Sequence, residues 1–160
     1  RIKVLCRLDN IRQIIPLDIA TGDPITANEI SYEYKSVFSD SVFEICAYNI
    51  ETMLAEKIQT VYQRGVFNSR SKDFYDIYML YHLRKEEIDF GNLKEACQNT
   101  FKYRNTDFNI DRILDVLHDL KDEKDLQTRW KSYQKRFSYA AEISFDDVID
   151  TAIEVIENIR

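Results

Sequence analysis

The stretch that decides the fold is residues 49–65, NIETMLAEKIQTVYQRG, where the residue pattern changes from extended to helical. Asn49 is a residue type that often caps the start of a helix, and Gly65 is the type that commonly follows the end of one. The stretch therefore predicts a helix that begins near residue 50 and ends before Gly65. Its apolar residues recur at three- and four-residue intervals, as on one face of a helix: Ile50, Met53, Leu54, Ile58, Val61 and Tyr62.

The residues before this helix predict a small β portion. Ile2–Leu8 and Gln13–Ala20 are rich in β-branched and aliphatic residues, and the Asp9-Asn10 turn signal between them favours a hairpin. Val42–Cys46 is a candidate for a third short strand. Because two or three strands alone make a poor sheet and the first begins directly at Arg1, we expect this chain to be a piece of a longer protein.

The residues after Gly65 show helical spacing throughout. Together with the preceding β portion they predict an α+β fold class. We expect a β-rich portion at residues 1–47 and a helical domain at residues 48–160. The further helices are expected at about residues 69–84, 90–101, 109–120, 122–140 and 144–158.

Composition excludes several classes of protein. Of the 160 residues, 44% are hydrophobic and 31% are charged, which is typical of a globular domain. No apolar run approaches the length of a membrane span, so no membrane association is expected. The three cysteines are widely spaced and form no metal-binding motif, which indicates reduced thiols and a cytoplasmic protein. The net charge of −6 argues against a general nucleic-acid coat, and no DNA partner is expected.

Lys57 is the most informative candidate for chemistry. It follows Ile50 by seven residues, so it lies within the apolar stripe of its helix. An ammonium group in that position either needs an anionic partner or extends its head to solvent.

Asp73 and Asp76 lie in the next expected helix, which is apolar almost all round and is therefore expected to be largely buried. Buried carboxylates require cations or strong hydrogen-bond donors. The pattern allows two interpretations, a structural salt-bridge network between helices or a functional site. The cations nearby in the sequence are Lys57, Arg64, Arg70 and Lys72.

Two further features are ambiguous. Asp18 ends a predicted strand, where a carboxylate either holds Mg²⁺ or initiates a turn. The segment Arg129–Arg136 carries four basic residues and no acid, interleaved with Trp130 and Tyr133. Its aromatics either stack bases or form the core face of a helix, whose spacing they fit. In the second case the basic residues lie on the solvated face, where they remain able to contact RNA.

Three stretches together resemble the AbiEii family of nucleotidyltransferase-like toxins, found in bacterial abortive-infection (phage-defence) and toxin–antitoxin systems. They are Ala47–Lys57, Gln63-Arg64 and Arg70–Tyr78, which reads RSKDFYDIY. The upstream Leu17–Ile25 and the tail from Trp130 to Ile159 are also similar to that family.

The resemblance implies part of a polymerase-β-like nucleotidyltransferase sheet followed by a mostly helical bundle. It implies Mg²⁺-dependent transfer of a nucleotidyl group from an NTP, with tRNA the acceptor in some members, and a cognate antitoxin as partner. The family's metal site begins with a Gly-Gly or Gly-Ser turn and an Asp-x-Asp pair, and this sequence contains neither. We therefore expect those carboxylates either to lie before Arg1 or to be absent, and we expect the chain alone to be inactive.

If the site residues of the family are assigned to the matching positions of this sequence, Asp18 would be a third carboxylate that binds the metal or acts as the base. Lys57 would contact the triphosphate, and Asp76 or Asp73 would orient Lys57 or the acceptor. Arg64 and Arg70 would add phosphate contacts. The alternatives are a non-catalytic helical module that binds an antitoxin or RNA, and a phosphotransferase that moves a different group from ATP.

Overall fold

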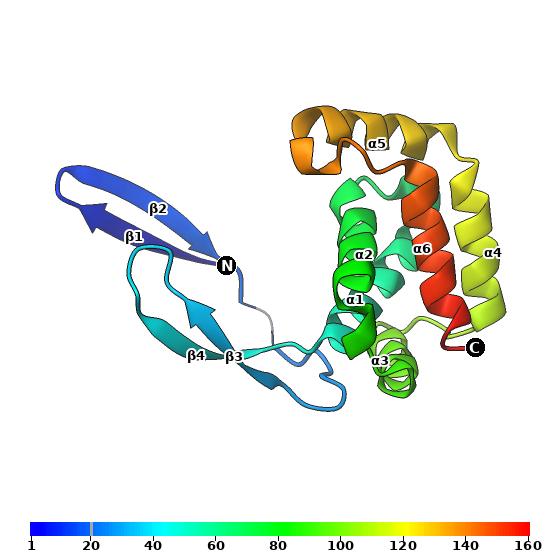
Figure 1. The fold of residues 1–160 in the computed structure, drawn as a ribbon, viewed down its shortest axis with the longest axis horizontal. Helices are drawn as coiled ribbons and strands as arrows, with labels where there is room; N and C mark the ends of the chain where they lie inside the picture. Colours follow the sequence, from blue (N-terminus) through cyan, green and yellow to red (C-terminus); the bar gives the residue numbers. More distant parts are fainter. Residues whose placement is uncertain (20) are drawn as a thin grey trace.

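The computed structural model describes residues 1–19 and 21–160, and it shows two β-hairpins followed by a helical body (Figure 1). The α+β fold class is confirmed. The strands are β1 (Ile2–Leu8), β2 (Ile11–Leu17), β3 (Ile30–Lys35) and β4 (Val42–Ala47). The helices are α1 (Ile50–Arg64), α2 (Ser71–Arg84), α3 (Phe90–Tyr103), α4 (Ile110–Lys121), α5 (Lys124–Arg136) and α6 (Phe145–Glu157).

The β portion consists of two separate two-stranded antiparallel sheets. In the first, Leu8 pairs with Ile11 across the two-residue turn at Asp9-Asn10, as the sequence predicted. This tight turn starts β2 at Ile11, two residues earlier than expected, and the expected end of that strand at Ala20 lies outside the described residues. The second sheet pairs β4 with β3, a strand that was not predicted although Ile30, Tyr32 and Tyr34 alternate with polar residues in its sequence ISYEYK.

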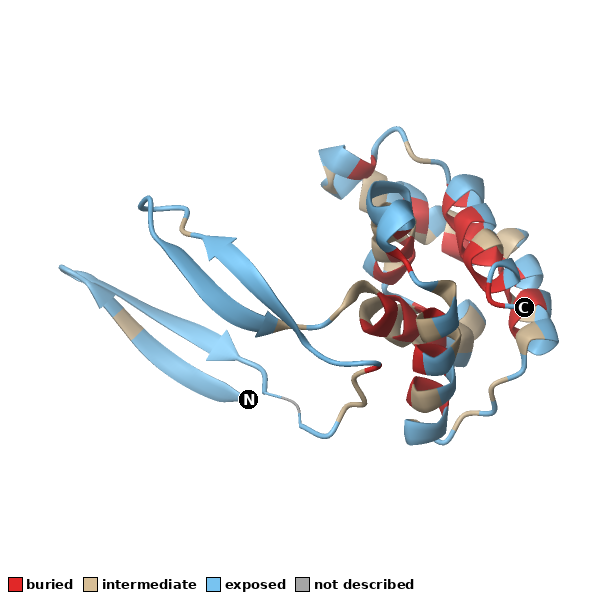
Figure 2. Ribbon diagram, turned by 60° about the horizontal axis from the view of Figure 1, so that its bottom comes forward, coloured by how far each residue is buried: buried red, intermediate tan, exposed pale blue. Residues whose placement is uncertain are grey.

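The hairpins contribute almost nothing to the core. Every residue of β2 and β3 is exposed, and apolar side chains such as Leu8 and Ile11 are 70% and 65% exposed (Figure 2). The buried apolar residues lie in the helical body, where the packing of α1 against α3 and of α6 against α2 and α4 encloses a single apolar cluster. Its largest fully buried side chains include Trp130, Tyr81, Phe74, Phe101, Leu54 and Ile149.

The start of α1 joins the β portion to the helical body. Asn49 accepts a hydrogen bond from the Thr52 backbone N–H at 2.8 Å, which confirms it as the N-cap, and its amide donates to the Asn28 carbonyl at 3.1 Å. Thr26 is buried there, and its backbone N–H donates to Thr52 Oγ1 at 3.1 Å. Gly65 ends the helix with a positive φ of 48°, a conformation that glycine adopts without a Cβ penalty.

Two helices differ from the prediction. α2 is not largely buried: one side packs against α1 and α6, whereas Leu83 on the other side is 69% exposed. α5 ends at Arg136 instead of continuing to residue 140, because Phe137 adopts an extended conformation (φ −128°, ψ 101°) and a short 3-10 turn follows. Within the described residues, no helix is both long and apolar enough to cross a bilayer.

Candidate functional site at the interface of α1 and α2

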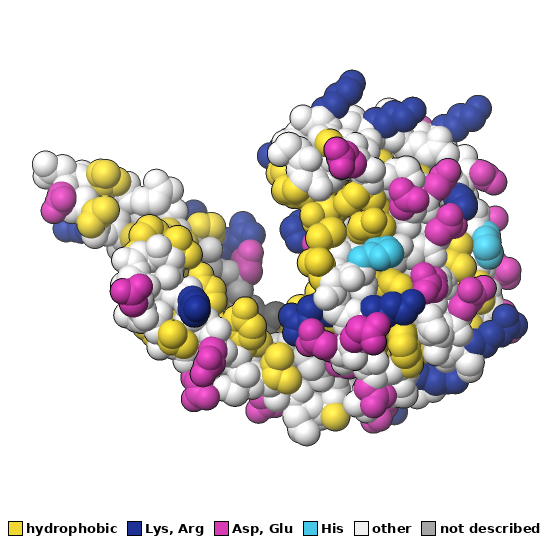
Figure 3. All heavy atoms as spheres, viewed as in Figure 1, with side chains coloured by type: hydrophobic (Ala, Val, Ile, Leu, Met, Phe, Trp, Pro, Cys, Tyr) yellow, Lys and Arg dark blue, Asp and Glu magenta, His cyan; other side chains and the backbone are white. Residues whose placement is uncertain are grey.

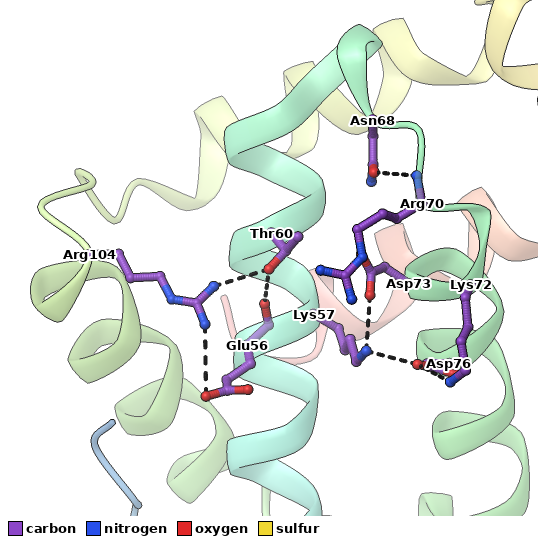
Figure 4. Close-up of polar contacts among 9 residues, drawn as sticks. All are labelled: Glu56, Lys57, Thr60, Asn68, Arg70, Lys72, Asp73, Asp76 and Arg104. Carbon is purple, nitrogen blue, oxygen red and sulfur yellow. Dashed lines mark hydrogen bonds and ion pairs between the residues drawn. The ribbon is translucent and has the colours of Figure 1, made fainter. Parts of the chain in front are cut away.

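The packing of α1 against α2 places an ammonium group between two carboxylates (Figure 4). Lys57 Nζ lies 2.9 Å from Asp73 Oδ1 and 2.8 Å from Asp76 Oδ2. Residues three apart share one face of a helix, so α2 presents both aspartates to the same partner. The expectation that Lys57 needs an anionic partner is therefore met, and the partners come from the neighbouring helix.

The two ion pairs are shielded to different degrees. The Asp73 side chain is 2% exposed, that of Asp76 is 16% exposed and that of Lys57 is 25% exposed. Burial lowers the pKa of Lys57, but its contacts with Asp76 and Asp73 outweigh burial and hold the pKa above its ordinary value. The ammonium is therefore charged at neutral pH and its position is set by two helical carboxylates.

Two more cations surround the carboxylates on the solvent side. Lys72 Nζ lies 2.6 Å from Asp76 Oδ1, and Arg70 Nε lies 3.2 Å from Asp73 Oδ2. We call these five residues the Lys57 cluster. It contains three positive and two negative groups, so it keeps one positive charge in excess for an anionic ligand.

Hydrogen bonding in the Lys57 cluster is incomplete. The Asp73 Oδ2 atom is buried and has no hydrogen-bond partner among the described residues, because the Arg70 contact is an ion pair without hydrogen-bond geometry. The side-chain amide nitrogen of Asn68 is also buried and has no hydrogen-bond partner among the described residues. Buried polar atoms are nearly always hydrogen-bonded, so these two atoms call for partners from outside the described residues, such as water or a bound group.

The opposite side of α1 carries a second polar group that sequence reasoning missed. Arg104, just after α3, donates to Gln59 Oε1 at 2.7 Å. It also donates to Thr60 Oγ1 at 3.0 Å (Figure 4). It also lies 3.8 Å from Glu56 Oε1, and burial raises the pKa of Glu56 while Arg104 opposes that effect. No sequence signal links Arg104 to α1, because the two are more than forty residues apart.

Two predicted site residues are not brought into the Lys57 cluster. Asp18 is 69% exposed at the end of the first hairpin, and its carboxylate pairs with Arg1 at 2.6 Å, which lowers the pKa of Asp18. Arg64 is exposed in the last turn of α1, and no ion pair involving it occurs among the described residues.

The donor set does not fit a divalent metal. No group of three or more histidine, cysteine or acidic side chains converges within residues 1–19 and 21–160. Asp73 and Asp76 are already paired with cations, and Asp18 is paired with Arg1. A hard cation such as Mg²⁺ needs several oxygen ligands, which these residues do not supply together.

Comparison with known proteins identifies the family of this chain. A family model described as "Nucleotidyl transferase AbiEii toxin, Type IV TA system" matches residues 1–151. The chain belongs to the AbiEii family. Comparisons with curated proteins and with solved structures found no match. The resemblance seen in the sequence is thereby confirmed.

Membership in the AbiEii family gives the general role, that of a nucleotidyltransferase toxin of a type IV toxin–antitoxin system. Enzymes of this class use an NTP and a divalent metal, and a toxin of this type has an antitoxin partner. Within this chain the Lys57 cluster is the candidate part of such a site, because it combines a half-buried cation with two carboxylates that are paired to it.

Proposed function

We propose that Lys57 binds the triphosphate of an NTP during nucleotidyl transfer. The observation that supports this role is the position of its ammonium between Asp73 and Asp76. An ammonium group has three N–H donors, and two are directed toward the carboxylates. The third is available to a phosphate oxygen, and the remaining exposure of Lys57, 25%, leaves room for that contact.

The neighbouring residues have separate proposed roles. Asp73, being nearly inaccessible, positions Lys57. Asp76 is more exposed and orients either Lys57 or the acceptor hydroxyl. Arg70 and Arg64 are exposed and add contacts to phosphate oxygens. Asp18 can take part in this site only after its ion pair with Arg1 is broken.

In the proposed reaction the acceptor hydroxyl oxygen forms a bond to the α-phosphorus of the NTP and loses its proton. The bond from that phosphorus to the bridging oxygen breaks, and pyrophosphate leaves. Because the described carboxylates do not fit a metal, we assign no step to a metal bound by them. We propose tRNA as the acceptor, a cognate antitoxin as the protein partner, Mg²⁺ as the metal of the complete site, and no activity for this chain alone.

The test is transfer of label from each α-labelled NTP to total tRNA by the complete gene product. We expect Lys57→Ala to lower the rate on the order of 100-fold, since a preorganised cation is lost at the phosphates. The matched control is Lys102→Ala, which removes an equivalent charge from an exposed position in the last turn of α3. Full transfer activity in Lys57→Ala would show that the assignment is wrong.

A second candidate function is a non-catalytic module that binds an antitoxin or RNA. It is favoured by one observation, the lack of a metal-binding donor set among the described residues. It predicts no label from any NTP in a protein that is folded. The mass of the product after incubation with unlabelled ATP separates nucleotidyl transfer from phosphoryl transfer, the third possibility raised by the sequence.

A further inference from the structure

A groove of about 340 Å³ lies between the start of α2 and the C-terminal half of α5. Its walls combine hydroxyl groups, aromatic rings and guanidinium groups, and they come from segments sixty residues apart in the sequence. We call it the α5 groove. The lining residues used below are Ser69, Ser71, Ser132, Tyr133, Arg136 and Phe137.

Two arginines, Arg129 and Arg136, line the α5 groove although the chain is acidic overall. Residues 129–136 contain four basic residues and no acid, and none of these four pairs with a carboxylate in the described part of the chain. Figure 3 shows dark blue side chains along the edge of the molecule where Figure 1 draws α5. Arg129 is used structurally, because it donates to the Asn68 carbonyl at 3.0 Å, whereas Arg136 is exposed at the groove.

The aromatic rings form a continuous surface at one end of the groove. The ring centroids of Tyr133 and Phe137 are 4.7 Å apart, and those of Phe137 and Tyr139 are 5.4 Å apart with nearly parallel planes. The guanidinium carbon of Arg136 lies 5.2 Å from the Phe137 centroid. Tyr133 and Phe137 are half-buried, and Tyr133 also stacks on Trp130 with ring centroids 5.4 Å apart. The parts of these two rings that line the groove lie beside Arg136, and rings beside an arginine can stack an unpaired base while its phosphate meets the charge.

The α5 groove is adjacent to the Lys57 cluster. Tyr75 of α2 packs against Tyr139 and Tyr133, with centroids 4.8 and 6.1 Å apart, and Asp76 is the next residue in the chain. Asp73, two residues after the groove residue Ser71, contacts Lys57. The α5 groove and the Lys57 cluster therefore share the N-terminal half of α2.

We propose that the α5 groove binds an unpaired nucleotide of the acceptor RNA, with its base on Phe137 and Tyr133 and its phosphate at Arg136 and the serine hydroxyls. The proposal rests on the proposed function, to which it adds the place where the acceptor is held. The occupant is a single strand, because base stacking on these rings requires a base that is free of a duplex.

Binding of a fluorescein-labelled single-stranded RNA of ten nucleotides, followed by fluorescence anisotropy without NTP, tests this directly. We expect Phe137→Leu to weaken binding about fivefold or more, because leucine keeps the apolar volume but offers no stacking surface. Phe137→Tyr should bind nearly as the wild type does. Arg136→Ala should also weaken binding and reduce the salt dependence by about one phosphate contact.

The matched control is Lys131→Ala, which removes a positive charge from the opposite side of the same helix, where Lys131 lines a different pocket. Equal weakening of RNA binding by Arg136→Ala and Lys131→Ala would overturn the proposal. Nonspecific electrostatic attraction between α5 and the RNA would then explain the binding. Tighter binding of a DNA probe of the same sequence would also overturn it.

This experiment separates failure of the groove from failure of the proposed function. Lys102→Ala should leave both RNA binding in the α5 groove and transfer unchanged, whereas Lys57→Ala lowers transfer. If Phe137→Leu binds RNA normally and Lys57→Ala loses transfer, the groove assignment alone is wrong. If Phe137→Leu loses binding and Lys57→Ala keeps transfer, the groove assignment stands and the role of Lys57 is wrong.

Discussion

Lys57 illustrates why a charged residue within an apolar stripe deserves a functional explanation. A buried ion pair is weak evidence for stability, because the desolvation of both charges offsets much of their attraction. Here one ammonium is held by two carboxylates, one of which is 2% exposed. Because the folded-state pKa of Lys57 is raised, its pairing stabilises the fold below its ordinary pKa of 10.5, and this stabilisation is lost as pH rises through the folded-state value.

At the residue scale we predict strong coupling between Lys57 and Asp73. Lys57→Met leaves the buried Asp73 carboxylate without its closest cation and should lower the free energy of unfolding by about 3 kcal/mol. The double variant Lys57→Met/Asp73→Asn should recover at least about 1 kcal/mol of that loss, measured by urea unfolding. It should remain inactive in nucleotidyl transfer, which separates the structural part of the role from the chemical part.

The control for this double-mutant cycle of Lys57 and Asp73 is Lys72→Met. Lys72 is 64% exposed and pairs with Asp76 at the surface, so its loss should change the free energy of unfolding by less than about 1 kcal/mol. Strictly additive effects of Lys57→Met and Asp73→Asn would contradict the coupling and would leave Lys57 as an ordinary surface-directed lysine.

At the scale of elements, α6 holds the helical body together. Eight of its residues are buried, and it packs against both α2 and α4. Its first turn is closed by a capping box, in which Asp147 N–H donates to Ser144 Oγ at 3.0 Å and Ser144 N–H donates to Asp147 Oδ2 at 3.1 Å. Since α6 supports α2, the cap at Ser144 indirectly supports the helix that carries Asp73 and Asp76.

We predict that Ser144→Ala lowers the free energy of unfolding by about 1 kcal/mol, because the first turn of α6 loses a hydrogen-bond acceptor. The corresponding fall in Tm is about 2–4 °C for a chain of this size. Ser138→Ala serves as the control, since Ser138 is exposed and its side chain makes no hydrogen bond within the described residues. A similar fall in Tm for both variants would argue against a specific capping effect.

At the scale of the whole molecule, the chain divides into parts of very different packing. The helical body has a continuous core, whereas the two hairpins extend beside a hollow that Figure 3 shows next to the helices. Isolated two-stranded sheets are marginally stable in water, and exposed apolar side chains on a hairpin commonly indicate an interaction surface. The hairpins therefore depend on their own turns and on the anchor at Thr26.

We predict that native-state hydrogen exchange will divide the chain at the start of α1. Backbone amides of β1 and β2 should exchange about 100-fold faster or more than those of Leu54 and Ile149, because no core restrains local opening of the hairpin. The measurement is amide exchange followed by NMR or mass spectrometry. Equal protection of hairpin and core amides would mean that the hairpins are covered in solution.

The sequence determined the local features of this protein. The six helices, the cap at Asn49, the stop at Gly65 and the hairpin turn at Asp9-Asn10 are encoded by neighbouring residues, and all were predictable from spacing. The family could be recognised for the same reason, because its motifs lie on consecutive turns of α1 and α2. The Lys57 position in the apolar stripe also indicated that an anionic partner was needed.

Only the tertiary structure decided which residues meet. The packing of α1 on α2 joined Lys57 to Asp73 and Asp76 and left Arg64 outside, although all four are close in sequence. The α5 groove arises because α5 packs across the start of α2, and no local pattern encodes that contact. Side-chain spacing specifies the face of a helix, but the partner of that face depends on how distant segments share one core.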